Sequence, residues 1–204
     1  MFCLTKQLLA SRKNLILLLA GVCLFAGSQV DAQYNVQIVP GSTLTNMTAG
    51  PVFNPTAPDA EVGVDLIVSA LASGNVSINT NTGGSQQGNI TFTTSLFPNG
   101  PGNTLTLNAS GSITMESIER SASFEAFALS LNADGGFIEG AGKSIVTGGG
   151  TVTINSFSTF SIGSISTSSS SSGGDITMIL GQDLIVNDNG SISASGGGAG
   201  AGTI

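Results

Sequence analysis

The sequence has no histidine and no tryptophan, and its two cysteines, Cys3 and Cys23, lie close to the amino terminus. The lack of histidine excludes any Ser-His-Asp triad and any histidine-ligated metal site. Aromatic residues make up only 5% of the chain. A hydrophobic core must therefore be built from small aliphatic and β-branched side chains rather than from large rings.

Positive charge is scarce beyond the first 32 residues. Of the five basic residues only Arg120 and Lys143 lie beyond residue 32. All of the twelve acidic residues except Asp31 lie beyond it. This acidic balance argues against binding to nucleic acid or to an anionic lipid surface. Charged residues total 8%, yet 40% of the chain is apolar. Disordered chains combine low hydrophobicity with high charge, so this composition predicts a folded chain.

Residues 1–32 have the pattern of a secretory signal peptide. Lys6, Arg12 and Lys13 give a basic start, residues 15–26 (LILLLAGVCLFA) form an apolar core, and residues 30–32 (VDA) place small side chains where a signal peptidase cleaves. The core is short for a membrane span, and a short membrane anchor is the alternative. A lipoprotein modified at the second cysteine is disfavoured by the valine before it. We expect export, with cleavage removing both cysteines and any disulfide or thiol chemistry.

Proline divides the rest of the chain into two regions. Residues 40–60 carry four of the six prolines and show little periodicity. We therefore predict that residues 33–61 form a linker or an irregular amino-terminal cap. The repeat region is predicted to cover residues 62–204.

From Val62 onward the chain consists of short alternating segments rich in Val, Ile, Thr and Leu, bounded by Gly, Asn or Ser, which predict β-strands. Residues 117–127 could instead form two helical turns, with an irregular strand or loop as the alternative. The predicted strands lie at residues 62–70, 75–80, 89–94, 104–109, 112–117, 128–133, 136–140, 143–147, 151–156, 160–165, 176–178, 184–186 and 192–194.

The spacing of these segments is more informative than their composition. Similar strands begin their apolar pattern at Leu105, Leu129, Val152 and Ile176, in steps of 24, 23 and 24 residues. Further segments, led by Ile113, Phe137, Ile145, Phe160, Leu184 and Ile192, divide most of each period into steps of seven to nine residues; the apolar beat is missing at Ser121 and at residues 167–172. A fixed period in this range is typical of stacked repeats.

Three short strands in about 24 residues suit one triangular turn of a right-handed parallel β-helix, in which successive turns stack at ~4.8 Å. About six turns fit after Val62, and Leu105, Leu129, Val152 and Ile176 should form one inward column. Corners are expected at the Gly- and Asn-rich segments 108–111, 132–136, 147–150, 171–174 and 188–190, because these residues accept unusual backbone angles. An antiparallel β-sandwich is the alternative fold, since its strands are spaced similarly.

The last two residues, Thr203 and Ile204, are predicted to begin a further turn. An uncapped solenoid end would expose strand edges and apolar surface. We therefore expect the chain to be the amino-terminal part of a longer protein or a truncated reading frame.

Several phrases of the repeat region resemble filamentous-haemagglutinin-like adhesins and autotransporter passengers of bacteria. They are GNITFTT, NTLTLNASGSITM, GGTVTINS and NGSISASGGGAGAGTI, within residues 75–204. The resemblance implies export to the cell or outer-membrane surface, an extended β-helix, a role in adhesion or biofilm formation, and contact with an outer-membrane secretion partner. The Asn-Pro-Asn-Gly signature of two-partner secretion is only partly met, by residues 53–56 (FNPT) and 97–100 (FPNG).

Acidic residues give two candidate pairs for catalysis. Glu116 and Glu119 lie beside Arg120, and Asp134 and Glu139 form a looser pair. A glycoside hydrolase needs two carboxylates ~5–9 Å apart, and a β-helical lyase needs basic groups to stabilise an anion. Two basic residues are few for a lyase, so we predict a chain that is not an enzyme and has no catalytic residues.

A calcium site is conceivable at Asp183, Asp188 and Asn189, because oxygen atoms are the ligands that calcium prefers. The spacing does not match the nonapeptide calcium repeat. We therefore predict neither a metal nor a cofactor.

The function predicted from these observations is that of an exported, non-catalytic, adhesin-like β-helical segment. Ladders of Ser, Thr and Asn on its outer faces would bind surface glycans or other chains of the same kind, without a small-molecule substrate. Two alternatives are a β-helical carbohydrate-active enzyme and a purely structural stalk or coat repeat.

Overall fold

The computed structural model describes residues 33–80, 84–98, 102–120, 126–170, 172–187, 189–196 and 202–204. The chain divides into two units, Met1–Asp31 and Ala32–Ile204, and the predicted signal peptide lies outside the described residues. Within the described part of the chain, no helix is long and apolar enough to cross a membrane.

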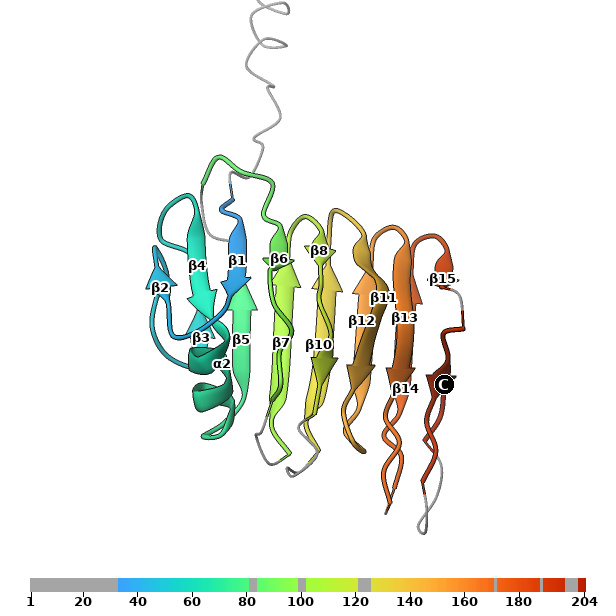
Figure 1. Ribbon diagram of the computed structural model, residues 1–204. Helices are drawn as coiled ribbons and strands as arrows, with labels where there is room; N and C mark the ends of the chain where they lie inside the picture. Colours follow the sequence, from blue (N-terminus) through green and yellow to red (C-terminus); the bar gives the residue numbers. More distant parts are fainter. Residues whose placement is uncertain are drawn as a thin grey trace, which may run out of the picture. The chain divides into compact units, whose positions relative to one another are not determined.

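Almost all regular structure is β (Figure 1). The single described helix is α2 (Val64–Leu71). The strands are β1 (Val36–Val39), β2 (Leu44–Thr45), β3 (Val52–Phe53), β4 (Ala60–Gly63), β5 (Val76–Asn79), β6 (Ile90–Phe92), β7 (Thr104–Ala109), β8 (Ile113–Thr114), β9 (Ile118–Glu119), β10 (Ala128–Ala133), β11 (Ile138–Val146), β12 (Val152–Ser156), β13 (Phe160–Ser166), β14 (Ile176–Leu180), β15 (Leu184–Val186) and β16 (Ile192–Ser193).

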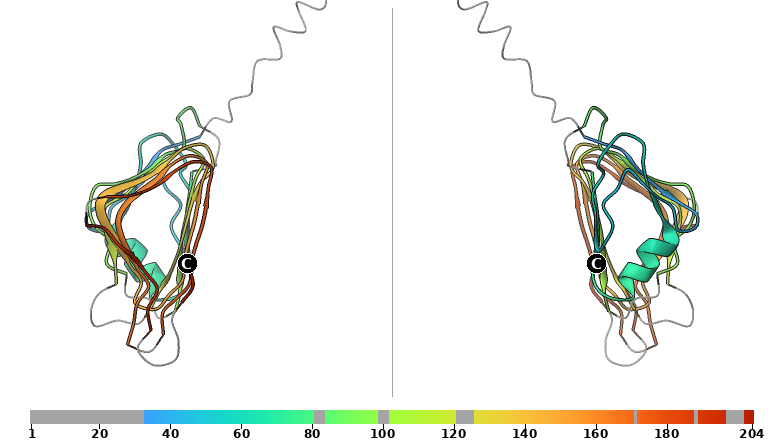
Figure 2. Two further views of the ribbon diagram at one scale, coloured as in Figure 1. Left: turned by 90° about the vertical axis from the view of Figure 1, so that its right-hand side faces the viewer. Right: turned by 90° about the vertical axis from the view of Figure 1, so that its left-hand side faces the viewer.

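These strands wind into a parallel β-solenoid of about six turns, roughly 24 residues apart. One sheet has six strands in the order β14-β12-β10-β7-β5-β3, and all its pairs are parallel. The other has ten strands, and of the described strands only β2 and β4 pair in antiparallel fashion. Seen along its axis, the solenoid has a three-sided cross-section (Figure 2). The predicted parallel β-helix is confirmed, and the antiparallel sandwich is wrong.

The predicted inward column is also confirmed. Leu105 pairs in register with Leu129, Leu129 with Val152, and Val152 with Ile176. All four side chains are buried. This column is a like-on-like stack of aliphatic residues. The expectation of a core without large rings is wrong elsewhere in the interior, where Phe53, Phe92, Phe127 and Phe160 are buried.

The end of the chain extends this column. Ile176 N donates a 2.8 Å hydrogen bond to Thr203 O. One turn earlier, Val152 N donates in the same way to Asp175 O, and there Val152 pairs with Ile176. This bond places Ile204 in register with Ile176, as predicted for the start of a further turn.

Strands β11 and β13 each run along both the second and the third side of the solenoid. Strand β11 pairs with β8 at Ile138 and with β9 at Ile145, and its register shifts between Gly140 and Ser144. The sequence predicts two strands there, at residues 136–140 and 143–147. They form one strand because a bulge bends it around the corner instead of ending it.

The alignment of one predicted strand is wrong by one residue. The spacing predicts that Phe137 leads the inward pattern, but Ile138 is the buried residue that stacks between Ile113 and Phe160. Since side chains alternate across a strand, Phe137 faces outward.

The strand predicted at residues 62–70 is wrong, because most of it is helix α2. Val64, Ile67, Val68 and Leu71 follow helical spacing, and Ile67 and Leu71 are fully buried. The helix lies at the end of the solenoid that carries β2, β3 and β4 (Figures 1 and 2).

Residues 33–61, predicted as a linker or an irregular cap, contribute strands and core residues. Strand β1 pairs with β4 on one side and β6 on the other, and Val36 and Ile38 are fully buried. Strand β1 thus lies one layer inside the solenoid, and β2 covers the outer edge of β4. In the segment 117–127, Ile118–Glu119 forms β9, and residues 121–125 lie outside the described chain.

Candidate functional site

The outer face of the six-stranded sheet is a regular array of small polar side chains. In β7 and β10 every second residue is a buried apolar one, and the residues between them point outward. Because the strands stack in register, like residues align from turn to turn. One such row consists of Ser77, Thr106, Ser130, Thr153 and Thr177.

A row of asparagines runs beside this hydroxyl row. The Nδ2 groups of Asn155, Asn132 and Asn108 each donate a 2.7 Å hydrogen bond to the Oδ1 atom of the asparagine one turn earlier. Asn79 continues the row with a 2.9 Å bond to Asn54. This amide ladder satisfies a donor and an acceptor on every internal member, as in stacked Asn ladders of cross-β structures.

The sequence pattern did not reveal this ladder. It predicts strands at residues 104–109 and 128–133 and corners that begin at Asn108 and Asn132; the strands are confirmed as β7 and β10, and both asparagines lie within them. The signal that could have found them is their fixed position after the column residues Leu105 and Leu129. The ladder ends at Ile179, which is in register with Asn155 and is 66% exposed.

The first candidate acidic pair is held in ionic and hydrogen-bonded contacts at a corner of the solenoid. Glu116 Oε2 lies 2.5 Å from Lys143 Nζ, and Glu119 accepts a hydrogen bond from the Ser144 hydroxyl. The Arg120 side chain packs over Gly148, where an added Cβ would lie 2.3 Å from its Nε. The contacts of the two glutamates tie the segment around β9 to β11, which is a structural role.

The second candidate pair is spread over two elements. Asp134 is exposed in the turn after β10, and Glu139 is exposed in β11. Each lines a different shallow hollow of the surface.

The residues considered for calcium are not gathered into a cage. Asp183 precedes β15, Asn189 lies in a turn with φ +60°, and Asp188 is outside the described residues. Over the described ranges, no group of three or more His, Cys, Asp or Glu residues could hold a metal ion.

Comparisons with protein-family models, curated proteins and solved structures give no match to this chain. The β-solenoid is compatible with β-helical surface proteins.

Proposed function

We propose that this chain is an exported, non-catalytic attachment element of the adhesin type, which works through the outer faces of its solenoid. The observation that carries the proposal is the array on the six-stranded sheet, where hydroxyl and amide rows repeat at the spacing of stacked strands, ~4.8 Å. Neither the hydroxyl row from Ser77 to Thr177 nor the asparagine row from Asn54 to Asn155 contains a charged residue.

Such a face suits a neutral, repetitive ligand. Hydroxyl and amide groups both donate and accept hydrogen bonds, as the hydroxyls of a polysaccharide do. Because the side chains sit on a rigid sheet, little conformational freedom is lost on binding. Many weak contacts in a row then add up, as in other multivalent attachments.

Export and surface location are part of the same proposal. They are supported by the basic start, apolar core and small residues of positions 1–32. An outer-membrane secretion partner would be needed to bring the folded solenoid to the cell surface.

The test uses beads coated with the full chain and films of neutral polysaccharides. We expect retention of the beads on at least one film, and loss of retention when Thr106, Ser130 and Thr153 are all replaced by Glu. The matched control places three Glu residues on the ten-stranded sheet instead, at the in-register positions Gln37, Thr91 and Thr114, and should retain binding.

Two results would contradict the proposal. Release of soluble sugar from a film would favour the carbohydrate-active enzyme. Self-association of the chain without retention on any film would favour the structural stalk or coat repeat.

A further inference from the structure

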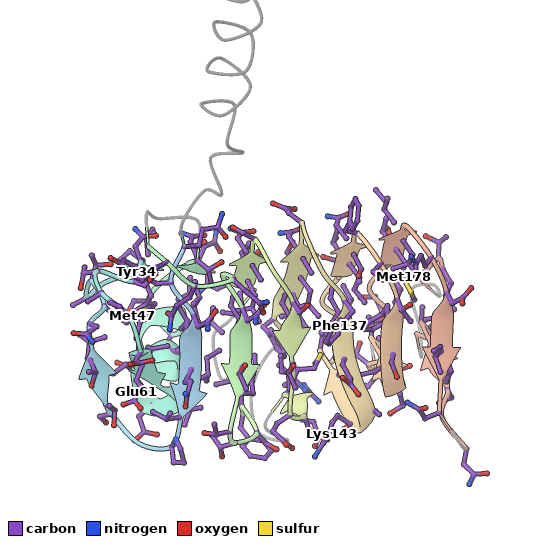
Figure 3. The ribbon with its side chains drawn as sticks, turned by 90° about the horizontal axis from the view of Figure 1, so that it is seen from above. Tyr34, Met47, Glu61, Phe137, Lys143 and Met178 are labelled. Carbon is purple, nitrogen blue, oxygen red and sulfur yellow. The ribbon has the colours of Figure 1, made fainter. Side chains whose placement is uncertain are left out.

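A groove runs along one corner of the solenoid, where the six-stranded sheet turns into the side that begins with β8, β11, β13 and β15. We call it the corner groove; its volume is about 580 Å³. The connections from β7 to β8, from β10 to β11 and from β12 to β13 lie at the top of Figure 1, and Figure 3 looks down on this side of the molecule. Its lining includes Gln87, Asn89, Phe137, Phe157, Ser158 and Gln182.

Glycine forms the floor of the corner groove over two successive turns. A Cβ at Gly136 would lie 2.1 Å from Ser112 Oγ, and one at Gly111 would lie 2.2 Å from Asn89 Oδ1. Neighbouring turns pack so closely there that a side chain does not fit. Gly111 and Gly136 therefore keep their place in the lining of the groove only as residues without a side chain.

Two phenylalanine rings stand in the groove. Phe157 is 69% exposed and Phe137 is 42% exposed, and Phe137 is labelled in Figure 3. Leaving a phenylalanine ring in water is unfavourable compared with burying it. Two rings left on one groove, in consecutive turns of a chain with few aromatic residues, point to a ligand that covers them.

Uncharged hydrogen-bonding groups surround the rings. Asn89 Nδ2 donates to Gln87 Oε1 at 3.1 Å, and Ser158 Oγ donates to Gln182 Oε1 at 3.2 Å. These bonds fix the two glutamine side chains through their oxygens. Among the described residues, neither glutamine Nε2 donates to a protein acceptor, so both can donate to a ligand.

The described lining of the groove offers no positive charge to an anionic ligand. Lys143 pairs with Glu116 at a different corner, and Arg120 packs over Gly148. None of the described cations therefore lines the groove to bind a phosphate, sulfate or uronate group. A flat apolar ring beside planar amides and hydroxyls is complementary to a pyranose ring, which has an apolar C–H face and an edge of hydroxyls.

We propose that the corner groove is a binding site for a neutral oligosaccharide segment, with Phe157 and Phe137 stacking on sugar rings and Gln87, Ser158 and Gln182 bonding their hydroxyls. This inference rests on the proposed attachment function and gives it a defined site and ligand class.

The experiment measures binding of the full chain to a panel of immobilised neutral oligosaccharides. We expect Phe157→Ala and Phe137→Ala each to weaken binding at least tenfold, and Phe157→Tyr to restore it. Phe97→Ala is the matched control, because Phe97 is also well exposed, at 55%, and does not line the groove. A thermal melt of each variant checks that the fold is unchanged.

Each other outcome overturns a distinct claim. If oligosaccharides bind equally well to the wild type and to Phe157→Ala and Phe137→Ala, the corner groove is not the site, although the attachment function stands. If beads adhere to films but no oligosaccharide binds, the groove proposal alone fails. If neither beads nor oligosaccharides bind, the attachment function fails as well.

Discussion

The Asn132 side chain donates a 2.7 Å hydrogen bond to the Asn108 side chain one turn earlier, and in turn accepts one of the same length from Asn155. Every bond of the amide ladder points the same way along the solenoid. Chains of aligned hydrogen bonds polarise one another, so an internal member contributes more than a terminal one.

We predict that Asn132→Leu lowers the free energy of unfolding by about 1–3 kcal/mol, because it removes two hydrogen bonds and leaves Asn108 Oδ1 and Asn155 Nδ2 without their partner. Denaturant unfolding measures the change. Thr153→Ala, on the same outer face, should cost less than about 0.5 kcal/mol. Equal losses for the two variants would show that the ladder contributes nothing specific.

The ladder can be extended by one residue. Ile179 is outward-facing and in register with Asn155. We predict that Ile179→Asn raises the free energy of unfolding by about 0.5–1.5 kcal/mol through a new bond to Asn155 Oδ1. Ile185→Asn is the control, because Ile185 is also exposed but pairs with Ser161 rather than with an amide. Equal effects of both substitutions would contradict the prediction.

Close packing at a glycine corner gives a third prediction. A Cβ at Gly150 would lie 1.8 Å from Phe127 O, a backbone atom that cannot move aside. We expect Gly150→Ala to lower the free energy of unfolding by about 3 kcal/mol or more. Gly74→Ala should be neutral or slightly stabilising, since no atom lies within 4 Å of the position that its new methyl group would occupy. Comparable melting temperatures for Gly150→Ala and Gly74→Ala would contradict the predicted destabilisation by the clash.

Acid should loosen the contact between Asp175 and Thr203. The Asp175 carboxylate accepts 2.9 Å hydrogen bonds from the backbone N and the Oγ1 of Thr203. The backbone bond and then the hydroxyl bond hold the pKa of Asp175 below its ordinary value of 3.8. Because the folded-state pKa lies below the unfolded one, this stabilisation is present above pH 3.8 and is lost as the pH falls through the folded-state pKa.

NMR titration of the Asp175 carboxyl carbon measures this pKa. A midpoint at or above 3.8 would contradict the prediction. The Ile176 amide, which donates to Thr203 O, should lose its exchange protection over the same pH range. Thr203→Val, which keeps the backbone donor but not the hydroxyl, should shift the midpoint partway back toward 3.8.

The repeat period is enough to predict the solenoid and the column from Leu105 to Ile176, because register in a stacked array follows from a regular count. It is not enough at Phe137 and Ile138, where two adjacent apolar residues leave the alternation ambiguous. It also fails at residues 64–71, where a run of apolar residues fits both a strand and a helix.

The parts that sequence could not predict depend on contacts between distant residues. Strand β1 lies between β4 and β6, although both of these strands come well after it in the sequence. The corner groove likewise depends on which turns stack next to Gly111 and Gly136. Neither can be read from a local pattern, since side chains in the groove come from residues 87 to 182.

The order of the first strands has a mechanical consequence. Strands β4 and β2 lie outside β1 in the sheet, although they follow it in the sequence, and α2 lies at the same end. That end is therefore held by strands that are paired out of sequence order. At the other end, β14, β15 and β16 pair with strands of the preceding turn alone, among the described strands. A steady pull on β14, β15 and β16 would therefore peel these turns one at a time, and each turn of about 24 residues would release on the order of 80 Å of chain. Under shear the peeled turns would lengthen and carry the force before the end that carries α2 unfolded.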